Sequence, residues 1–410
     1  MAKEAVVESN VDVDFQTFRN AVLNDYRLAC ISREASLLGR KEVLTGKAKF
    51  GIFGDGKELA QIALAKQFQD GDFRSGYYRD QTLMMAIDQL NVQQYFAGLY
   101  AHTDVEVEPQ SAGRQMGGHY STRNLDEKGE WKNLMQQKNS SADISPTAGQ
   151  MPRLLGLAQA SKVYRHHPAL KELDEFKKFT TNGNEVAFGT IGDASTSEGP
   201  FWETINAAGV LQVPMVMSIW DDGYGISVPR EFQTTKGSIS EALAGMQRTK
   251  DKPGYEIFIT KGWDYAHLCE TYEKAVKLAR EEHVPVLVHV KEVNQPQGHS
   301  TSGSHERYKS EERLQWETDF DCINKFREWI LDFNADGNTL ASAEELDSIH
   351  KEAKTRVRDQ KNAAWKAFTE DIKHDLATAI ALIKAVAAES PNRVFVEKEA
   401  EALEKAFEPI

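Results

Sequence analysis

Cysteine is scarce in this chain of 410 residues, which contains only Cys30, Cys269 and Cys322. The three are far apart and show none of the paired spacings of a zinc site or a disulfide framework. We therefore expect free thiols in a reducing compartment. Long apolar runs are absent, and the first residues form neither a secretory signal nor an Arg-rich transit peptide. These absences predict a cytoplasmic protein without a membrane partner.

Positive charge is in deficit, because 49 Lys and Arg residues stand against 62 Asp and Glu residues and give a net charge of −13. No cluster of Lys and Arg offsets this balance, so we expect no nucleic-acid partner. The loop Gly-x-x-x-x-Gly-Lys-Ser/Thr is also absent, which disfavours a phosphotransferase that uses ATP and Mg²⁺. The hydrophobic content of 40% is ordinary for a globular protein.

The most informative stretch is 186–229, which we interpret as strand, loop, helix, strand and loop. Residues 186–191 and 213–220 are apolar and β-rich, as buried parallel strands are. A helix over 199–210 is predicted between them, because proline is tolerated at the first helical position. Parallel strands joined by such a crossover end at the same edge of a sheet.

That shared edge brings together two carboxylates, Asp193 after the first strand and Asp222 after the second. With the carbonyl groups of the turn at 223–225, they suit Mg²⁺, which takes oxygen ligands and often binds a diphosphate as well. The small residues after the first strand are Gly192, Ala194 and Ser195. Their size lets backbone N–H groups approach phosphate oxygens. The alternative is ordinary turn chemistry, in which Asp and Gly are frequent.

Gly-Asp-x-x-x-Ser-Glu-Gly at 192–199 and Asp-Gly-Tyr-Gly-Ile-Ser-Val-Pro at 222–229 together resemble a known motif. It is the thiamine diphosphate motif of alpha subunits from the decarboxylating component of 2-oxo acid dehydrogenase complexes. The resemblance covers about residues 20–370. It implies an α/β thiamine diphosphate-binding fold, the diphosphate-binding half, with a mostly parallel sheet flanked by helices and a helical C-terminal tail.

The resemblance implies that Asp193, Asp222 and the carbonyl of Tyr224 hold Mg²⁺, with Gly225 beside the cofactor. Two departures from the family motif are visible. Ala194 replaces a glycine and adds one methyl group next to the diphosphate. Asp221-Asp222 replaces Asn-Asn, which keeps an oxygen ligand but adds negative charge that repels the diphosphate. Cofactor affinity is the property that these changes affect.

Two further segments contain residues that the resemblance assigns to the cofactor. Tyr78 and Arg79 follow a short extended run, where an Arg can bind phosphate in bidentate fashion. From the residues alone, a surface Arg at a helix start is the alternative. Ser145 begins the segment in which the family contacts the thiamine ring. Gly149 stands where some members have a Thr ligand for K⁺, so no K⁺ site is predicted.

A Gly/Ser-rich loop with the sequence Gly-His-Ser-Thr at 298–301 follows a predicted strand at 285–290. Imidazole titrates near neutral pH, and loops over sheet ends often carry catalytic groups. A polar turn is the alternative reading of His299. In the family, the His of this loop reaches the cofactor and assists acyl transfer to lipoamide, which makes His299 the catalytic candidate. Ser300 matches a phosphorylated position of mitochondrial members, and its regulation stays open.

The resemblance also bears on the substrate. Asp80-Gln81 and Gly-Arg-Gln-Met-x-x-His-Tyr at 113–120 are closer to branched-chain members than to pyruvate members. The implied reaction is oxidative decarboxylation of a branched-chain 2-oxo acid and reductive acylation of a lipoyl group on an acyltransferase. The alternatives are the alpha subunit of a pyruvate or acetoin dehydrogenase, or a non-catalytic paralogue that keeps the fold.

A partner chain is implied as well, because a beta chain supplies the carboxylate that activates the aminopyrimidine in this family. We expect an α₂β₂ assembly or a fused beta half. Within the chain we expect a helical arm at 1–45, the cofactor-binding domain at 46–320 and a helical region at 321–410. The turn 54–58, Gly-Asp-Gly-Lys-Glu, follows no strong strand, so we expect it only to cap a helix at 58–68.

Overall fold

The centre of the computed structural model, which describes residues 14–405, is a six-stranded sheet. All its strand pairs are parallel, and the strand order is β2-β1-β3-β4-β8-β7. The strands of this sheet are β1 (Phe73–Ser75), β2 (Asn139–Ser140), β3 (Ala187–Gly192), β4 (Met215–Trp220), β7 (Glu256–Lys261) and β8 (Val286–Lys291). Residues 1–13 of the predicted helical arm and residues 406–410 of the predicted helical C-terminal region lie outside the described residues.

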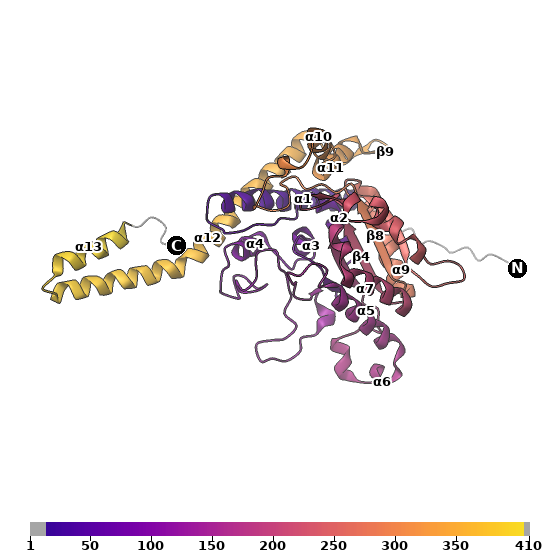
Figure 1. Ribbon diagram of the computed structural model, residues 1–410, viewed down its shortest axis with the longest axis horizontal. Coiled ribbons are helices and arrows are strands. Elements are labelled where there is room, and N and C mark those ends of the chain that lie inside the picture. The colour runs from indigo at the N-terminus through magenta and orange to yellow at the C-terminus, as the bar shows by residue number, and fades with distance from the viewer. Residues whose placement is uncertain (1–13, 406–410) are drawn as a thin grey trace.

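Helices surround the sheet and continue beyond it (Figure 1). They are α1 (Phe15–Leu44), α2 (Glu58–Ala65), α3 (Gln81–Ala86), α4 (Val92–Leu99), α5 (Met151–His166), α6 (Pro168–Lys171), α7 (Gly199–Leu211), α8 (Ile239–Ala242), α9 (Tyr265–Glu282), α10 (Glu311–Asp319), α11 (Cys322–Asp332), α12 (Ala343–Glu389) and α13 (Arg393–Glu404). The short 3-10 turns are η1 (Leu134–Gln136), η2 (Asp174–Lys178), η3 (Ala194–Ser197), η4 (Arg230–Phe232), η5 (Thr235–Gly237), η6 (Ala244–Met246) and η7 (His305–Arg307). Two small hairpins pair β5 (Tyr224–Gly225) with β6 (Val228–Pro229) and β9 (Asn334–Ala335) with β10 (Asn338–Thr339).

The central strands are buried on both faces, and alternate residues enter two different hydrophobic cores. In β4, Val216 and Trp220 belong to the core that contains α2 and α9. Met215 and Met217 of the same strand belong to the core that contains α5 and α7. Helices therefore cover both faces of the sheet, which confirms the predicted α/β fold class.

The predicted strands at 186–191, 213–220 and 285–290 are present as β3, β4 and β8, with ends shifted by one or two residues. The predicted helix between the first two is α7. The sequence did not reveal β1 and β2, because strands of 3 and 2 residues have no periodicity to detect.

The predicted C-terminal helical region is dominated by α12, a helix of 47 residues. Its first half packs against α1 and α4, and its second half projects away from the body and pairs with α13 (Figure 1). The β9–β10 hairpin that precedes α12 was not predicted. In the described part of the chain, no helix combines the length and apolarity needed to span a membrane.

Candidate active site

A cavity of about 300 Å³ lies at the carboxyl edge of the sheet, where β1, β3 and β4 end. Its lining comes from the segments that follow these strands and from the loop after β8. The lining residues are Tyr77, Tyr78, Arg79, Thr147, Gly192, Asp193, Ala194, Ser195, Trp220, Asp222, Tyr224, Gly225, Ile226 and His299. Every site residue predicted from sequence is in this set except Ser145.

The pairing of β3 with β4 explains why the two aspartates share the cavity. Gly192 lies opposite Trp220 in the parallel register, so both strands end at the same level. The backbone N–H of Asp193 donates to the carbonyl of Trp220 at 3.2 Å. The crossover through α7 therefore places Asp193 and Asp222 on the same edge, as the sequence predicted.

Of the aspartates at this edge of the sheet, Asp193 is the one that forms no ion pair with a Lys, Arg or His of the described chain. Its side chain is 6% exposed, and no ion pair to it is found within residues 14–405. Burial raises the pKa of Asp193 well above its usual range, and the charges of Asp222 and Asp221 raise it further. A cation bound beside this carboxylate would relieve both effects.

Asp221, by contrast, is paired with a cation, Arg230, and with a buried imidazole. Its Oδ2 accepts from Arg230 at 2.8 Å and lies 2.9 Å from Nε2 of His289. Burial acts to raise the pKa of Asp221, but the hydrogen bond and charge of His289 and the charge of Arg230 outweigh it and lower the pKa. His289 is fully buried, and its Nδ1 lies 2.8 Å from the hydroxyl of Ser240.

Asp222 is paired with Lys57, whose Nζ lies 3.5 Å from Oδ2. The other carboxylate oxygen accepts the backbone N–H of Tyr224 at 3.2 Å. The side chain of Lys57 is 1% exposed and also donates to Oε1 of Gln295 at 2.8 Å. Burial lowers the pKa of Lys57, as does the charge of Arg79, while Asp222 acts in the opposite direction.

The turn that carries Lys57 therefore does more than begin a helix. α2 does start at Glu58, but Lys57 at the N-cap makes no side-chain capping bond. Gly56 has a φ of +86°, and a Cβ there would lie 2.0 Å from the carbonyl oxygen of Asn294. This close packing against the loop after β8 directs Lys57 to Asp222. No local sequence signal indicated the contact, because the partners belong to segments far apart in the chain.

Arg79 and His299 form the opposite side of the site. One guanidinium nitrogen of Arg79 lies 3.1 Å from Nδ1 of His299 and 2.9 Å from its carbonyl oxygen. The other donates to the carbonyl of Phe53 at 2.6 Å. Because an Arg can only donate, Nδ1 of His299 is the acceptor and the proton of the neutral ring is on Nε2. Burial lowers the pKa of His299 to about 4, and the charge of Arg79 contributes.

Ser145 lies outside the cavity lining, and its hydroxyl is 3.1 Å from Nε2 of His119. Thr147, two positions later, lines the cavity instead. Sequence reasoning also missed Tyr77, Trp220 and Ile226. Trp220 ends a strand whose apolar pattern indicated only core packing. Its indole N–H is nevertheless buried without a hydrogen-bond partner among the described residues.

These observations fit a metal ion with an anionic ligand. Within the described residues, no group of three or more His, Cys, Asp or Glu side chains could hold a metal. The predicted Mg²⁺ site has only two carboxylate side chains, and its third ligand is a backbone carbonyl, so it does not count as such a group. The uncompensated Asp193 suits the cation, and the unpaired N–H of Trp220 suits an anion. A Cβ at Gly225 would lie 2.9 Å from Cβ of Ala194, so glycine lets the two loops approach each other.

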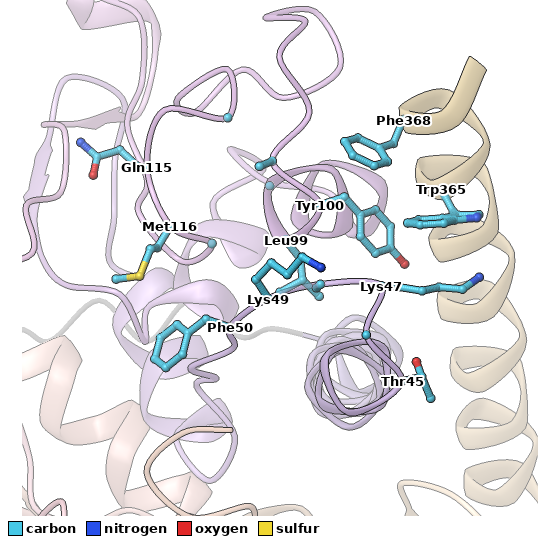
Figure 2. A pocket seen from close by; sticks show the side chains of 16 residues that line it. Thr45, Lys47, Lys49, Phe50, Leu99, Tyr100, Gln115, Met116, Trp365 and Phe368 are labelled. Atoms are coloured by element: carbon cyan, nitrogen blue, oxygen red, sulfur yellow. The ribbon is translucent and has the colours of Figure 1, made fainter. Parts of the chain in front are cut away.

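A larger cavity of about 510 Å³ lies elsewhere, between the 45–50 segment, the end of α4, the 113–117 loop and α12 (Figure 2). Trp365 and Phe368 of α12 face Tyr100 across it. Its lining contains no carboxylate, imidazole or thiol and none of the predicted site residues. The metal ligands and the imidazole predicted from sequence lie in the smaller cavity instead.

Comparison with known proteins gives a family match over most of the chain. The sequence model of a family described as "Dehydrogenase E1 component" matches residues 26–373. The 2-oxoisovalerate dehydrogenase subunit alpha of Bacillus subtilis (strain 168) is 27% identical over 245 residues, which are 60% of this chain and 62% of that protein. The human mitochondrial 2-oxoisovalerate dehydrogenase subunit alpha is 24% identical over 289 residues, 70% of this chain and 55% of that protein.

A relative with a different name is also similar. The pyruvate dehydrogenase E1 component subunit alpha of Rickettsia bellii (strain RML369-C) is 26% identical over 178 residues, which are 43% of this chain and 50% of that protein. The chain thus spans less than two thirds of the length of each of these three relatives.

Proposed function

Because the chain belongs to the dehydrogenase E1 component family, we propose that it is the alpha-type part of a 2-oxo acid dehydrogenase that uses thiamine diphosphate and Mg²⁺. The observation that carries the proposal is that one cavity unites the predicted metal ligands, the predicted diphosphate contacts and the predicted catalytic imidazole. These residues come from four separate segments of the chain. They are Tyr78, Arg79, Asp193, Asp222, Tyr224 and His299.

In this proposal Asp193, Asp222 and the carbonyl of Tyr224 hold Mg²⁺, because hard oxygen ligands suit that ion. The diphosphate is bound by Tyr78 and Arg79 and by the backbone that follows β3. The bound cofactor supplies the electron sink that decarboxylation of a 2-oxo acid requires. The chain contributes binding, orientation and charge.

His299 is the proposed catalytic residue. Its Nδ1 is occupied by Arg79, so the neutral ring keeps its proton on Nε2. The low pKa of His299 keeps the ring neutral at physiological pH, in the form that can donate a hydrogen bond from Nε2–H to the bound cofactor or substrate. Arg79 therefore orients His299 as well as offering positive charge to the diphosphate.

A branched-chain 2-oxo acid is the proposed substrate. Two of the relatives named above are 2-oxoisovalerate dehydrogenase subunits, and a pyruvate enzyme is the alternative. The structure gives Gln81, part of the branched-chain resemblance, no place in the cavity. Its amide instead donates to Ser36 at 2.8 Å and accepts from Gly54 at 3.1 Å. A panel of 2-oxo acids, compared by kcat/KM, decides the substrate.

A beta chain or fused beta half is the proposed partner, together with a lipoyl-bearing acyltransferase. The carboxylates of the cavity lining are Asp193 and Asp222, and both are assigned to the metal. Ile226 of the cavity lining is 60% exposed, and Phe232, in the turn η4 that follows the β5–β6 hairpin, is 78% exposed. Such a surface is typical of an interaction site. The free cysteines agree with the reducing cytoplasm that we propose as the location.

The proposal is tested by calorimetric titration of thiamine diphosphate at saturating Mg²⁺, with and without the candidate beta partner. Asp193→Ala should weaken binding by about tenfold or more, because a charged ligand is lost. The exposed Asp251 offers a matched control, and Asp251→Ala should leave the affinity unchanged. Absence of binding to the unsubstituted chain in both settings would refute the proposal and favour the non-catalytic paralogue.

A further inference from the structure

Three aspartates meet at the ends of β3 and β4, and two of them are paired with cations from the chain itself. Arg230 pairs with Asp221 at 2.8 Å, and Lys57 pairs with Asp222 at 3.5 Å. Asp193 has no such partner within residues 14–405. The distribution of charge around the cavity is therefore set by residues outside its lining.

Lys57 has an unusual position for an ammonium group. Its side chain is 1% exposed, and a buried charge is retained only where it is paired and hydrogen-bonded. The side-chain amide oxygen of Gln295 and the carboxylate of Asp222 meet that requirement. Because Gly56 packs tightly against Asn294, the backbone fixes where this ammonium can lie.

A count of formal charges shows what the pair does. With all three side chains ionised, Asp193, Asp222 and Lys57 together carry one net negative charge. A divalent metal ion bound by the two carboxylates then leaves one net positive charge, which attracts a diphosphate. If Lys57 were neutral, the same metal ion would be fully balanced by the two carboxylates, and the attraction for the anion would be lost.

We propose that Lys57 is the fixed counter-ion of Asp222, and that this ion pair makes the site favour metal together with diphosphate over metal alone. Lys57 is thus a positioning residue that acts through Asp222. The inference rests on the proposed function for the identity of the anion. Its effect on metal affinity alone can be measured even where no cofactor binds.

The test is a double-mutant cycle with Lys57→Met and Asp222→Asn, read by calorimetry with Mn²⁺ alone and with thiamine diphosphate at saturating Mg²⁺. The charge count predicts that the single variants shift Mn²⁺ affinity in opposite directions. Lys57→Met should raise Mn²⁺ affinity by about tenfold and lower thiamine diphosphate affinity by about tenfold. Asp222→Asn should lower Mn²⁺ affinity by about tenfold.

The double variant has the same net charge at the metal as the unsubstituted chain. Both affinities should therefore return to within about threefold of the original values. Lys361→Met is the matched control, because Lys361 is only 13% exposed and pairs with Glu42. Neither residue lines the cavity. Lys361→Met should therefore change neither the Mn²⁺ affinity nor the thiamine diphosphate affinity.

An unchanged or lowered Mn²⁺ affinity in Lys57→Met would overturn the inference, because it would show that Lys57 acts only by packing. If Lys57→Met alone does not fold, Asp222→Asn and the double variant carry the test. Removal of Lys57 must then raise Mn²⁺ affinity in the Asp222→Asn background, and an unchanged value would also overturn the inference. Absence of thiamine diphosphate binding to the unsubstituted chain would refute the proposed function but leave the Mn²⁺ cycle readable.

Discussion

At the scale of single residues, two polar groups of the cavity lining lack an expected partner within residues 14–405. The carboxylate of Asp193 has no cation, and the indole N–H of Trp220 has no acceptor among the described residues. Buried polar groups are nearly always hydrogen-bonded in folded proteins. A carboxylate without a cation and an N–H without an acceptor among the described residues therefore suit a ligand that carries both positive and negative charge, as a metal diphosphate does.

Trp220→Phe tests the role of the indole N–H. The substitution keeps the apolar ring and removes the donor, so thiamine diphosphate affinity should fall by about three- to tenfold, the range expected for one hydrogen bond. Calorimetric titration measures it. Trp202→Phe is the control, because Trp202 lies on α7 and is 37% exposed. Equal affinities in both variants would show that the N–H of Trp220 does not contact the cofactor.

At the scale of elements, α12 connects the globular body to the projecting C-terminal hairpin. Trp365 lies 4.9 Å from the ring of Tyr100, and Nζ of Lys47 lies 4.4 Å from the Trp365 ring (Figure 2). Phe368 packs beside them, 5.7 Å from Trp365. These contacts fix the middle of α12 to the end of α4.

Trp365→Ala should lower the free energy of unfolding by about 2–3 kcal/mol, less than for a fully buried Trp because the ring is partly exposed. Urea denaturation measures this loss. Leu382→Ala, on the projecting half of the same helix, is the control. Leu382 is 63% exposed, so its loss should be within about 0.5 kcal/mol. Similar losses in the two variants would mean that the aromatic cluster does not anchor α12.

At the scale of the whole molecule, buried histidines couple stability to pH. His283 ends α9 with a φ of +55° and is 5% exposed. Its Nε2 lies 2.9 Å from the carbonyl of Gly183, and its buried Nδ1 has no hydrogen-bond partner within residues 14–405. Burial lowers the pKa of His283 from 6.5 to about 4, and the charge of Arg165 adds to this effect.

Because the folded chain resists protonation of His283, the unfolded chain binds more protons between pH 6.5 and about 4. The contribution of His283 to the free energy of unfolding should therefore fall as the pH drops through this range and stay constant above it. His283→Asn, which tolerates a positive φ, should reduce the slope in urea denaturation at pH 4.5–7.5. The exposed His374 gives the control His374→Asn. Parallel curves for both variants would contradict the prediction.

Much of the site could be predicted from sequence because its central part is local. The strands β3 and β4 have apolar patterns, and their connection through α7 has a fixed hand, so Asp193 and Asp222 had to meet. The resemblance to a family then assigned roles to Tyr78, Arg79 and His299, and the cavity contains all three. Those roles remain proposals that the experiments above address.

Sequence alone therefore established the fold class, the family resemblance and the edge of the sheet where the site lies, because these depend on periodicity, motif order and chain handedness. The tertiary structure decided which charges pair across the site. Lys57 reaches Asp222 only because the turn before α2 packs against the loop after β8. It also excluded Ser145 from the cavity and placed Trp220 and Thr147 in its wall. Such contacts join segments that are distant in the chain, and no local pattern of residues encodes them.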